Sequence, residues 1–395
     1  MKIGISAASF VPGVAGGLET YFRALLEYLP LLGPQNEYVL FCKRTVKDQF
    51  VIPKQMSVVT VDYARHSLAW GVRHGIRFLT GQDLLLKKMD AQHLDIIHHP
   101  FTAMNPLGLK TPKVLSFADM QQELFPDFFS DYELRVRKAS YKPSVDSAEK
   151  VIVPSNFTRQ CLIERYGTAP EKIAVIHYGY NEDFREIKDQ GRIASFQEQH
   201  GLDKPYMFYP AATWPHKNHA NLIEALYLLK NEARFDGYLV LTGIARGAQD
   251  DLLELCRTRD LSSMVKFLGY LPYEDLPVLF SGARLMVFPS LFEGFGIPAV
   301  EAMACGCPVV CSNATSLPEV VGDAGILFEP CSPEDMAEKI ALVWNDEARR
   351  MKMIESGYER VKLFDWHSAI RKTLDVYSEV SSIKNNSINS QRYAG

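Results

Sequence analysis

The sequence predicts an α/β protein with two doubly wound parallel sheets that follow each other along the chain. At 395 residues the chain is longer than one hydrophobic core usually serves, so two domains are expected. Short apolar runs alternate throughout with amphipathic segments of helical length, which is the pattern of parallel sheets covered by helices. A polar stretch over residues 181–200 interrupts this alternation once. We therefore expect one domain over residues 1–180 and another over residues 200–364.

The predicted strands are short runs rich in β-branched or apolar residues. In such sheets ligands bind beyond the carboxyl ends of the strands, so the loops that follow the strands are the places to look for a site. The first series is predicted at Ile3–Ala7, Tyr38–Cys42, Val58–Val61, Asp95–His98, Val114–Phe117, Val151–Val153 and Ile173–Ile176, and the second at Met207–Tyr209, Leu239–Thr242, Val265–Leu268, Leu285–Phe288, Val309–Cys311 and Ile326–Phe328.

Composition excludes several classes of protein. With 47% hydrophobic and 23% charged residues the chain has ample core material, and only the polar tail over residues 384–395 is expected to fray. No apolar run approaches the roughly 18 residues of a membrane span, so we expect a cytosolic protein. The net charge is −4, with a mildly basic first half and an acidic second half, and neither half is basic enough to predict nucleic-acid binding.

The seven cysteines do not predict a metal site or a redox pair. None of them stands at Cys-x-x-Cys spacing, and the cluster of Cys305, Cys307 and Cys311 has no His or carboxylate close by in the sequence. A metal site is one interpretation of the cluster, and buried thiols are the favoured one.

The segment after the strand Leu285–Phe288 carries the clearest chemistry. Glu293-Gly294-Phe295-Gly296 forms a loop, and Pro298 suits the first turn of a following helix that contains Glu301. Free amides at a helix N-terminus favour a phosphate, and the two glutamates offer acceptors to hydroxyl groups beside it. The alternative is that both glutamates are solvated and that the glycines only form a turn.

A second loop, after the strand Met207–Tyr209, contains Thr213, Trp214, His216 and Lys217, and it precedes a helix that Asn218 could cap. A lysine in such a loop can bind a diphosphate as a point charge, although Lys217 could equally be a surface charge. His216 is interpreted as a turn residue, and Trp214 as a residue that covers the hinge.

Two features of the first half are weaker. Gly16 and Gly17 precede a helix predicted over Tyr21–Leu29, but their spacing is not Gly-x-Gly-x-x-Gly, so a dinucleotide site is disfavoured and a flexible loop facing a cleft is the alternative. His98 and His99 end a strand, where they either line the cleft or merely flank Pro100. No Ser-His-Asp or Cys-His arrangement is legible in the sequence.

Taken together, these motifs resemble the retaining glycosyltransferases of family 4, which have the GT-B fold of two Rossmann-like domains facing a central cleft. The resemblance rests on Glu293 and Glu301 with seven residues between them, and it extends over nearly the whole chain. The matching segments, in the family's order, are Gly16-Gly17 with Glu19, Val153–Phe157, Gly179, Lys217-Asn218, Phe267–Gly269, Glu293–Val310 and Leu317–Val320. In this family a C-terminal helix, here about residues 365–383, crosses back to the first domain.

The resemblance implies a role for each matching residue. Glu301 would hold the ribose hydroxyls, Glu293 would position the donor sugar, and Lys217 would neutralise the diphosphate, so Glu293 and Lys217 are the catalytic candidates. Gly17 would approach the diphosphate from the first domain. The implied donor-binding set is Gly16, Gly17, Thr213, Lys217, Leu268, Glu293, Gly294, Phe295, Gly296 and Glu301, and the implied acceptor or cleft residues are Glu19, His98, His99 and Asp119.

The sequence departs from the family pattern at two places. Many members carry an arginine five or six residues before the lysine, where this chain has Ala211 and Ala212. One cation for the diphosphate is then missing or comes from elsewhere. Many members also carry a histidine directly before Asp119, where this chain has Ala118, and His98 or His99 could compensate for it.

The expected activity is a metal-independent transfer of a hexose such as mannose, with retention of configuration, from a UDP- or GDP-sugar to a glycan or lipid-linked acceptor. We expect it to serve polysaccharide biosynthesis and to need no cofactor. An epimerase or a phosphorylase on the same fold is one alternative. A subunit that binds nucleotide sugars without turning them over is another.

The stretch over residues 65–79 alternates basic and large apolar residues, and Lys87 and Lys88 follow it. Its apolar residues at helical spacing, with Arg65, Arg73 and Arg77 on other sides, predict a peripheral contact of the first domain with the inner membrane surface. The alternative is a core-packed helix with a solvated basic edge, and Gly71 and Gly75 weaken the prediction of a helix.

Overall fold

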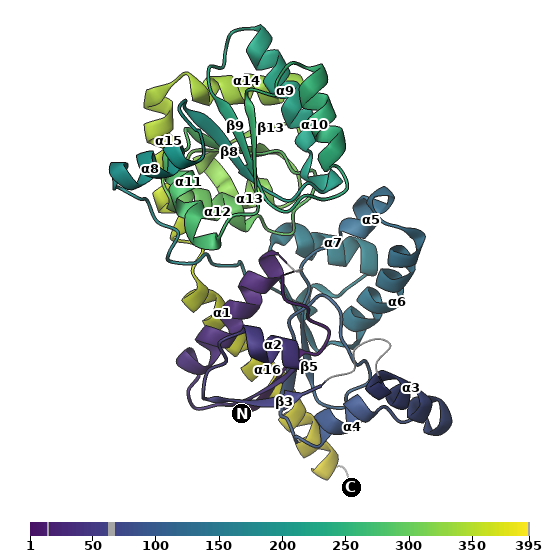
Figure 1. The fold of residues 1–395 in the computed structure, drawn as a ribbon. Coiled ribbons are helices and arrows are strands. Elements are labelled where there is room, and N and C mark those ends of the chain that lie inside the picture. The colour runs from purple at the N-terminus through teal and green to yellow at the C-terminus, as the bar shows by residue number, and fades with distance from the viewer. Residues whose placement is uncertain (14–15, 62–67, 394–395) are drawn as a thin grey trace. The chain divides into compact units, whose positions relative to one another are not determined.

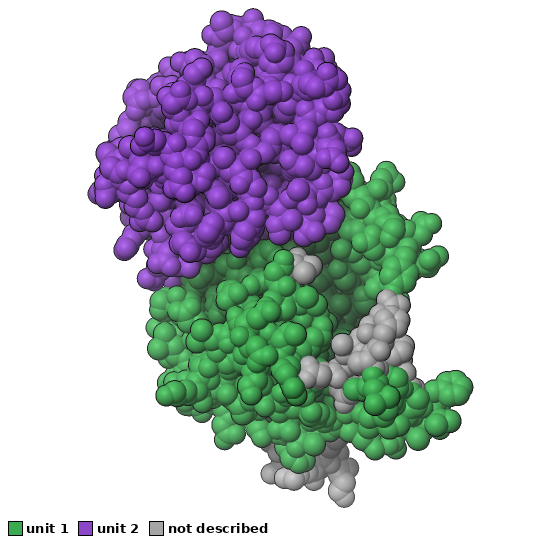
Figure 2. Space-filling view, viewed as in Figure 1, with its two compact units in different colours: residues 1–179, 366–395 green, residues 180–365 purple. Residues whose placement is uncertain are grey.

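A computed structural model describes residues 1–13, 16–61 and 68–393. The chain divides into two compact units, which Figure 2 distinguishes by colour. The first unit comprises Met1–Gly179 and Trp366–Gly395, and the second comprises Tyr180–Asp365. The chain therefore leaves the first unit after Gly179 and returns to it at Trp366.

The first unit is built around a seven-stranded sheet in which all the described strand pairs are parallel. The strand order is β3-β2-β1-β4-β5-β6-β7, so the chain reverses direction across the sheet between β1 and β4. The strands are β1 (Lys2–Ala7), β2 (Glu37–Cys42), β3 (Met56–Thr60), β4 (Ile96–His99), β5 (Lys113–Ser116), β6 (Lys150–Val153) and β7 (Ile173–Val175).

Helices cover this sheet because parallel strands need crossover connections. Helix α16 packs against α1 and against strands β4, β5 and β6, so the end of the chain completes the core of the first unit (Figure 1). The helices are α1 (Gly17–Leu32), α2 (Arg44–Gln49), α3 (Leu68–Thr80), α4 (Leu84–Asp90), α5 (Gln121–Leu124), α6 (Asp131–Ser147), α7 (Asn156–Tyr166) and α16 (Trp366–Tyr393), with 3-10 turns η1 (Pro126–Phe128) and η2 (Pro170–Lys172).

The second unit has a six-stranded parallel sheet of order β10-β9-β8-β11-β12-β13. Here the direction reverses between β8 and β11, which makes the carboxyl ends of these two strands the usual ligand position. The strands are β8 (Tyr206–Pro210), β9 (Tyr238–Thr242), β10 (Val265–Gly269), β11 (Leu285–Phe288), β12 (Val309–Ser312) and β13 (Gly325–Phe328).

Helices lie on both faces of the second sheet (Figure 1). Helices α9, α10 and α14 pack together as one layer, and α8, α11, α12 and α15 pack together as the other. The elements are α8 (Gln190–Gln199), α9 (His219–Asn231), α10 (Gln249–Thr258), α11 (Leu276–Gly282), α12 (Ile297–Ala304), α13 (Leu317–Val321), α14 (Pro333–Trp344) and α15 (Glu347–Val361), with η3 (Pro215–Lys217), η4 (Tyr273–Asp275) and η5 (Gly322–Ala324).

The predicted fold class is confirmed, and each predicted strand lies within two residues of its observed bounds. The polar stretch that the sequence placed between the domains belongs to the second unit, where α8 packs on α11. Residues 384–393, part of the tail that is expected to fray, form the end of α16. Its polar residues include no glycine or proline that would end the helix.

Helix α3 forms in spite of Gly71 and Gly75, but Arg73 is buried. The guanidinium of Arg73 forms an ion pair with the carboxylate of Asp83 at 2.6 Å, and these side chains are only 10% and 5% exposed. The expectation that Arg73 faces an anionic surface is therefore wrong, because a buried carboxylate already neutralises it. Arg65 and the side chain of Arg77 lie outside the described parts of the structure.

No helix in the described parts of the chain is both long and apolar enough to span a membrane.

Candidate active site

Two loops meet at the carboxyl edge of the second sheet, where the strand order reverses. The loop after β8 and the loop after β11 are joined by a backbone hydrogen bond from Leu291 N to His216 O at 2.8 Å. The amide of Asn218 adds two bonds, to Pro289 O at 2.9 Å and to Pro330 O at 2.7 Å. Asn218 stands at the N-cap of α9 as predicted, but its side chain forms no cap hydrogen bond, because it is used to join the loops.

The hydrogen bonds between these two loops bring Lys217 and Glu293 together. The ammonium of Lys217 donates to Glu293 Oε1 at 2.6 Å, and the two side chains are 20% and 14% exposed. The backbone of Glu293 is held as well, because its N–H donates to Thr315 Oγ1 at 3.0 Å and its carbonyl accepts from Ser316 Oγ at 3.0 Å. The structure thus presents a fixed, partly exposed cation and carboxylate side by side.

The glycine loop leads directly into α12. Gly296 is the N-cap residue with φ of 106°, and a Cβ built there would lie 2.6 Å from Leu317 Cδ2, so both conformation and space favour glycine. Pro298 lies in the first turn, as predicted. Ser316 Oγ donates to Phe295 O at 2.8 Å and holds the loop. The N-terminus of α12 therefore follows Glu293 closely in the sequence. The backbone N–H groups and the dipole at the start of a helix favour a bound anion.

Glu301 is a deeply buried carboxyl group on α12. It is 4% exposed, and its Oε1 accepts a hydrogen bond of 2.6 Å from the hydroxyl of Tyr273. Burial raises the pKa of Glu301 from 4.5 to about 7, although the hydrogen bond from Tyr273 lowers it. Near neutral pH this group is therefore divided between its charged and neutral forms, as is common for functional carboxyl groups.

The remaining donor-side candidates line the neighbouring strand ends. Thr213 is buried, and its hydroxyl accepts from Arg246 N at 2.7 Å. Leu268 is partly exposed near the end of β10, where Gly269 O accepts from Gly243 N at 2.7 Å. His216 contributes its backbone carbonyl to the joint between the loops, and burial lowers the pKa of its imidazole to about 3. A neutral His216 agrees with its interpretation as a turn residue.

In the first unit, Gly16, Gly17 and Glu19 form the start of α1. Gly16 is the N-cap residue with φ of 50°, and Glu19 accepts from Gly13 N at 2.7 Å and from Arg23 at 2.7 Å. The carboxylate of Glu19 is thus held by one backbone and one side-chain hydrogen bond of the first unit. Asp119 is partly exposed after β5 and accepts a 3.3 Å bond from Gln121 N.

His98 and His99 are both buried within the first unit, which favours the second of the two interpretations, that they flank Pro100. His98 is fully buried, with its Nδ1 2.5 Å from Tyr377 Oη and its Nε2 2.8 Å from Ser116 Oγ. Burial lowers the pKa of both imidazoles to about 3. His98 therefore joins α16 to the sheet of the first unit, and no ring nitrogen is left for an acceptor. His99 is 1% exposed, and its Nε2 has no hydrogen-bond partner within the part of the chain that is described.

Sequence reasoning missed the residues that position the candidates. Tyr273 contacts Glu301, and Thr315 and Ser316 hold the backbone of Glu293. Their partners are 22 to 28 residues away along the chain, and single Tyr, Thr and Ser residues carry no spacing signal, so no sequence pattern would have found them.

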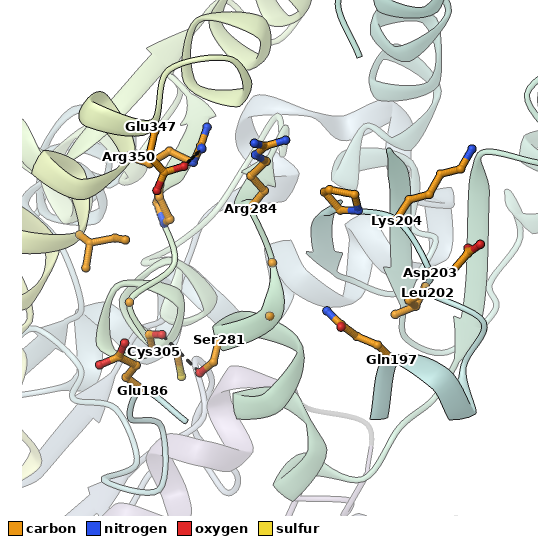
Figure 3. A pocket seen from close by; sticks show the side chains of 16 residues that line it. Glu186, Gln197, Leu202, Asp203, Lys204, Ser281, Arg284, Cys305, Glu347 and Arg350 are labelled. Carbon is orange, nitrogen blue, oxygen red and sulfur yellow. Dashed lines mark hydrogen bonds and ion pairs between the residues drawn. The ribbon is translucent and has the colours of Figure 1, made fainter. Parts of the chain in front are cut away.

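A cavity of about 550 Å³ in the second unit lies elsewhere, at the amino ends of β8, β11 and β12 (Figure 3). Its lining includes Lys204 before β8, Arg284 before β11 and Cys305 before β12. The cavity is at the opposite edge of the sheet from Lys217 and Glu293, and none of the candidate residues lines it. Cys305, Cys307 and Cys311 are buried thiols. The described residues contain no group of three or more His, Cys, Asp or Glu residues that could hold a metal ion.

Comparisons with known proteins agree with this geometry. The pattern of the glycosyl transferases group 1 matches residues 192–360, and that of glycosyltransferase family 4 matches residues 15–184. The O-antigen chain mannosyltransferase B of Escherichia coli is 32% identical over 318 residues, which cover 77% of this chain and 83% of that protein. The serotype-specific mannosyltransferase WbdA of Escherichia coli is 30% identical, over 60% of this chain and 29% of that much longer protein.

Among solved structures, Anabaena Alr3699/HepE in complex with UDP-glucose superposes with a TM-score of 0.74 at 23% identity, over 96% of this chain and 100% of that one. This likeness shows that the fold is GT-B. The paired units, the joined strand-end loops and the sequence relatives lead to one conclusion: the chain belongs to glycosyltransferase family 4 and is a nucleotide-sugar glycosyltransferase of polysaccharide or glycan biosynthesis.

Proposed function

We propose that the protein is a retaining, metal-independent hexosyltransferase whose donor binds at the carboxyl edge of the second sheet. The observation that carries the proposal is the 2.6 Å pair of Lys217 and Glu293 beside the glycine loop at the start of α12. In this proposal Lys217 and Glu293 flank the reacting end of the donor, and Glu301 binds its ribose.

The electrostatic argument concerns the leaving group. As the bond from the anomeric carbon to the β-phosphate oxygen breaks, its electron pair departs with the nucleoside diphosphate, where negative charge grows. The ammonium of Lys217 and the amides of Phe295 and Gly296 stabilise that charge from fixed positions, which is commonly the largest contribution to such catalysis. These groups supply the role that a metal ion plays in other transferases, and this supports metal independence.

The transfer itself is proposed to occur on one face of the sugar. The acceptor oxygen forms the new bond to the anomeric carbon on the side that the diphosphate leaves, and the proton of the acceptor hydroxyl passes to the departing phosphate oxygen. Glu293 accepts a hydrogen bond from a donor-sugar hydroxyl and orients Lys217, so it positions the sugar and does not form a covalent bond.

Donor and acceptor classes are proposed from the relatives. The similar E. coli protein is named as an O-antigen chain mannosyltransferase, which supports mannose or a related hexose as the transferred sugar and a glycan or lipid-linked molecule as the acceptor. On the first unit, Gly16 and Gly17 are proposed to meet the donor phosphates, and Glu19 and Asp119 to meet the acceptor. His98 is omitted because its ring is fully engaged.

The test is a panel of UDP- and GDP-sugars, first by thermal shift and then by turnover. A true donor raises the unfolding temperature by mass action and supports sugar transfer to an acceptor glycan. Sugar conversion without acceptor would instead identify an epimerase, and dependence on inorganic phosphate a phosphorylase. Binding without any turnover of any donor would contradict the proposal and identify a non-catalytic subunit.

We also propose a peripheral contact with the inner membrane surface through α3. Leu68, Phe78 and Leu79 of this helix are 88%, 90% and 80% exposed, which is unusual for large apolar side chains on one short segment. Lys87 and Lys88 follow in the last turn of α4 and supply positive charge. The revised contact rests on these apolar side chains and lysines, because Arg73 is already paired.

A further inference from the structure

The charges at the donor site do not balance with Lys217 alone. Its ammonium already pairs with Glu293, so the pair has no net charge. A nucleoside diphosphate carries at least two negative charges, and anions in partly buried sites need charged donors to replace their hydration. A second cation is therefore expected at the carboxyl ends of β8 and β9.

Backbone hydrogen bonds hold Arg246 near the carboxyl ends of β8 and β9. It lies in the loop after β9, and its N–H donates to Thr213 Oγ1 at 2.7 Å. The same hydroxyl donates to Arg246 O at 3.3 Å, and Thr213 N donates to Ile244 O at 3.4 Å. Because Thr213 stands four residues before Lys217, these bonds fasten the loop of Arg246 to the loop that carries the lysine.

The side chain of Arg246 contacts an aromatic ring but has no anionic partner among the described residues. Its guanidinium carbon lies 5.2 Å from the ring centroid of Trp214, in a cation–π contact. Its Nε is buried, with no hydrogen-bond partner among the described residues, and none of their carboxylates forms an ion pair with it. A buried N–H donor without an acceptor costs free energy, so this guanidinium group is suited to bind an anion.

We infer that Arg246 binds the donor diphosphate as the second cation of the site, an inference that rests on the proposed function. The Trp214 ring lies 5.2 Å from the guanidinium carbon, and arginine suits this task because its planar fork can donate two parallel hydrogen bonds. Trp214 from the loop after β8 and Arg246 from the loop after β9 thus extend the site beyond the pair of Lys217 and Glu293.

The experiment compares Arg246→Ala with Arg284→Ala by calorimetric titration with UDP, GDP, UMP and GMP. Arg284 is a matched control, because its guanidinium carbon lies 5.1 Å from the Trp344 ring and it is also partly exposed, but at the other edge of the sheet (Figure 3). Replacing the Arg246 side chain leaves the loop intact, since Thr213 bonds only to the backbone of Arg246. Thermal unfolding of each variant verifies its folding.

We expect Arg246→Ala to weaken binding of the preferred nucleoside diphosphate by roughly 10- to 100-fold and to change monophosphate binding by less than about threefold. Arg246→Lys should recover part of the loss, and Arg284→Ala should match the wild type. If the wild type prefers a diphosphate and Lys217→Ala weakens it, but Arg246→Ala matches Arg284→Ala, the inference is overturned while the proposed function stands. If the wild type binds neither diphosphate, the proposed function itself fails.

Discussion

Replacing Glu301 by glutamine should raise the stability of the protein and at the same time weaken its binding of nucleotide. The Glu301 carboxyl group is 4% exposed, and burial raises its pKa from 4.5 to about 7. The folded protein therefore binds more protons than the unfolded chain between these pH values, so the free energy of unfolding falls as the pH rises through this window. Glutamine does not titrate, and its Oε1 can still accept the hydrogen bond from Tyr273.

The shift from 4.5 to about 7 corresponds to about 3 kcal/mol, because each pKa unit represents about 1.4 kcal/mol. Glu301→Gln should therefore exceed the wild type in free energy of unfolding by about 1 kcal/mol at pH 5 and by about 3 kcal/mol at pH 8. The variant should also bind nucleotide roughly 10- to 100-fold more weakly, since a neutral amide loses the charge-assisted bonds to the ribose hydroxyls.

The assay is urea unfolding of both proteins at several values between pH 5 and pH 8, followed by nucleotide titration over the same range. Wild-type affinity should rise by up to roughly tenfold from pH 6 to pH 8 as the carboxyl group ionises, while the variant stays level. Glu355→Gln, on the exposed surface of α15, is the control. A stability difference that does not change with pH would refute the burial argument, and unchanged affinity would refute the ribose assignment.

Three further predictions follow from the site and from α3. Glu293→Gln should lower kcat by at least about 100-fold with little change in nucleotide Kd, because the neutral side chain no longer orients Lys217; equal kcat values would remove Glu293 from the mechanism. Activity should persist in EDTA, and its complete loss in chelator with recovery on adding Mn²⁺ or Mg²⁺ would contradict metal independence. In sedimentation with anionic vesicles, Phe78→Ser/Leu79→Ser should leave the pellet while Leu31→Ser, another exposed apolar position, behaves as the wild type; equal pelleting of the double variant and the wild type would mean that α3 is not the contact.

The local pattern of the sequence determined the elements and the loops that carry the chemistry. Continuous apolar runs mark buried parallel strands, and each run became a strand within two residues of its predicted bounds. Pro298 after the glycines indicated a helix start, and the structure has one there. These features depend on neighbours in the chain, so the sequence contains them directly. The succession of two parallel sheets along the chain follows from the same alternation of strand and helix.

Only the tertiary structure decided which polar side chains are engaged and with what. His98 and His99 look like site residues at a strand end, yet α16 covers His98, and Tyr377 bonds to it from 279 residues away. Arg73 was predicted near a membrane surface, yet it pairs with the buried Asp83. Asn218 stands at the predicted N-cap, but its side chain joins two loops instead of capping the helix. Arg246 carries no signal in the sequence, and its link to the loop of Lys217 comes from the hydrogen bonds between its backbone and Thr213.

The physical reason is the same in each case. Secondary structure follows from local backbone preferences and the period of apolar residues, both of which are short-range properties. The burial, pairing and pKa of a polar group depend on atoms that folding brings together from distant parts of the chain, and one residue type can serve as a ligand, a joint or a surface charge. The sequence therefore determined which loops carry the candidate residues, and the packing within each unit decided which of their side chains are already engaged.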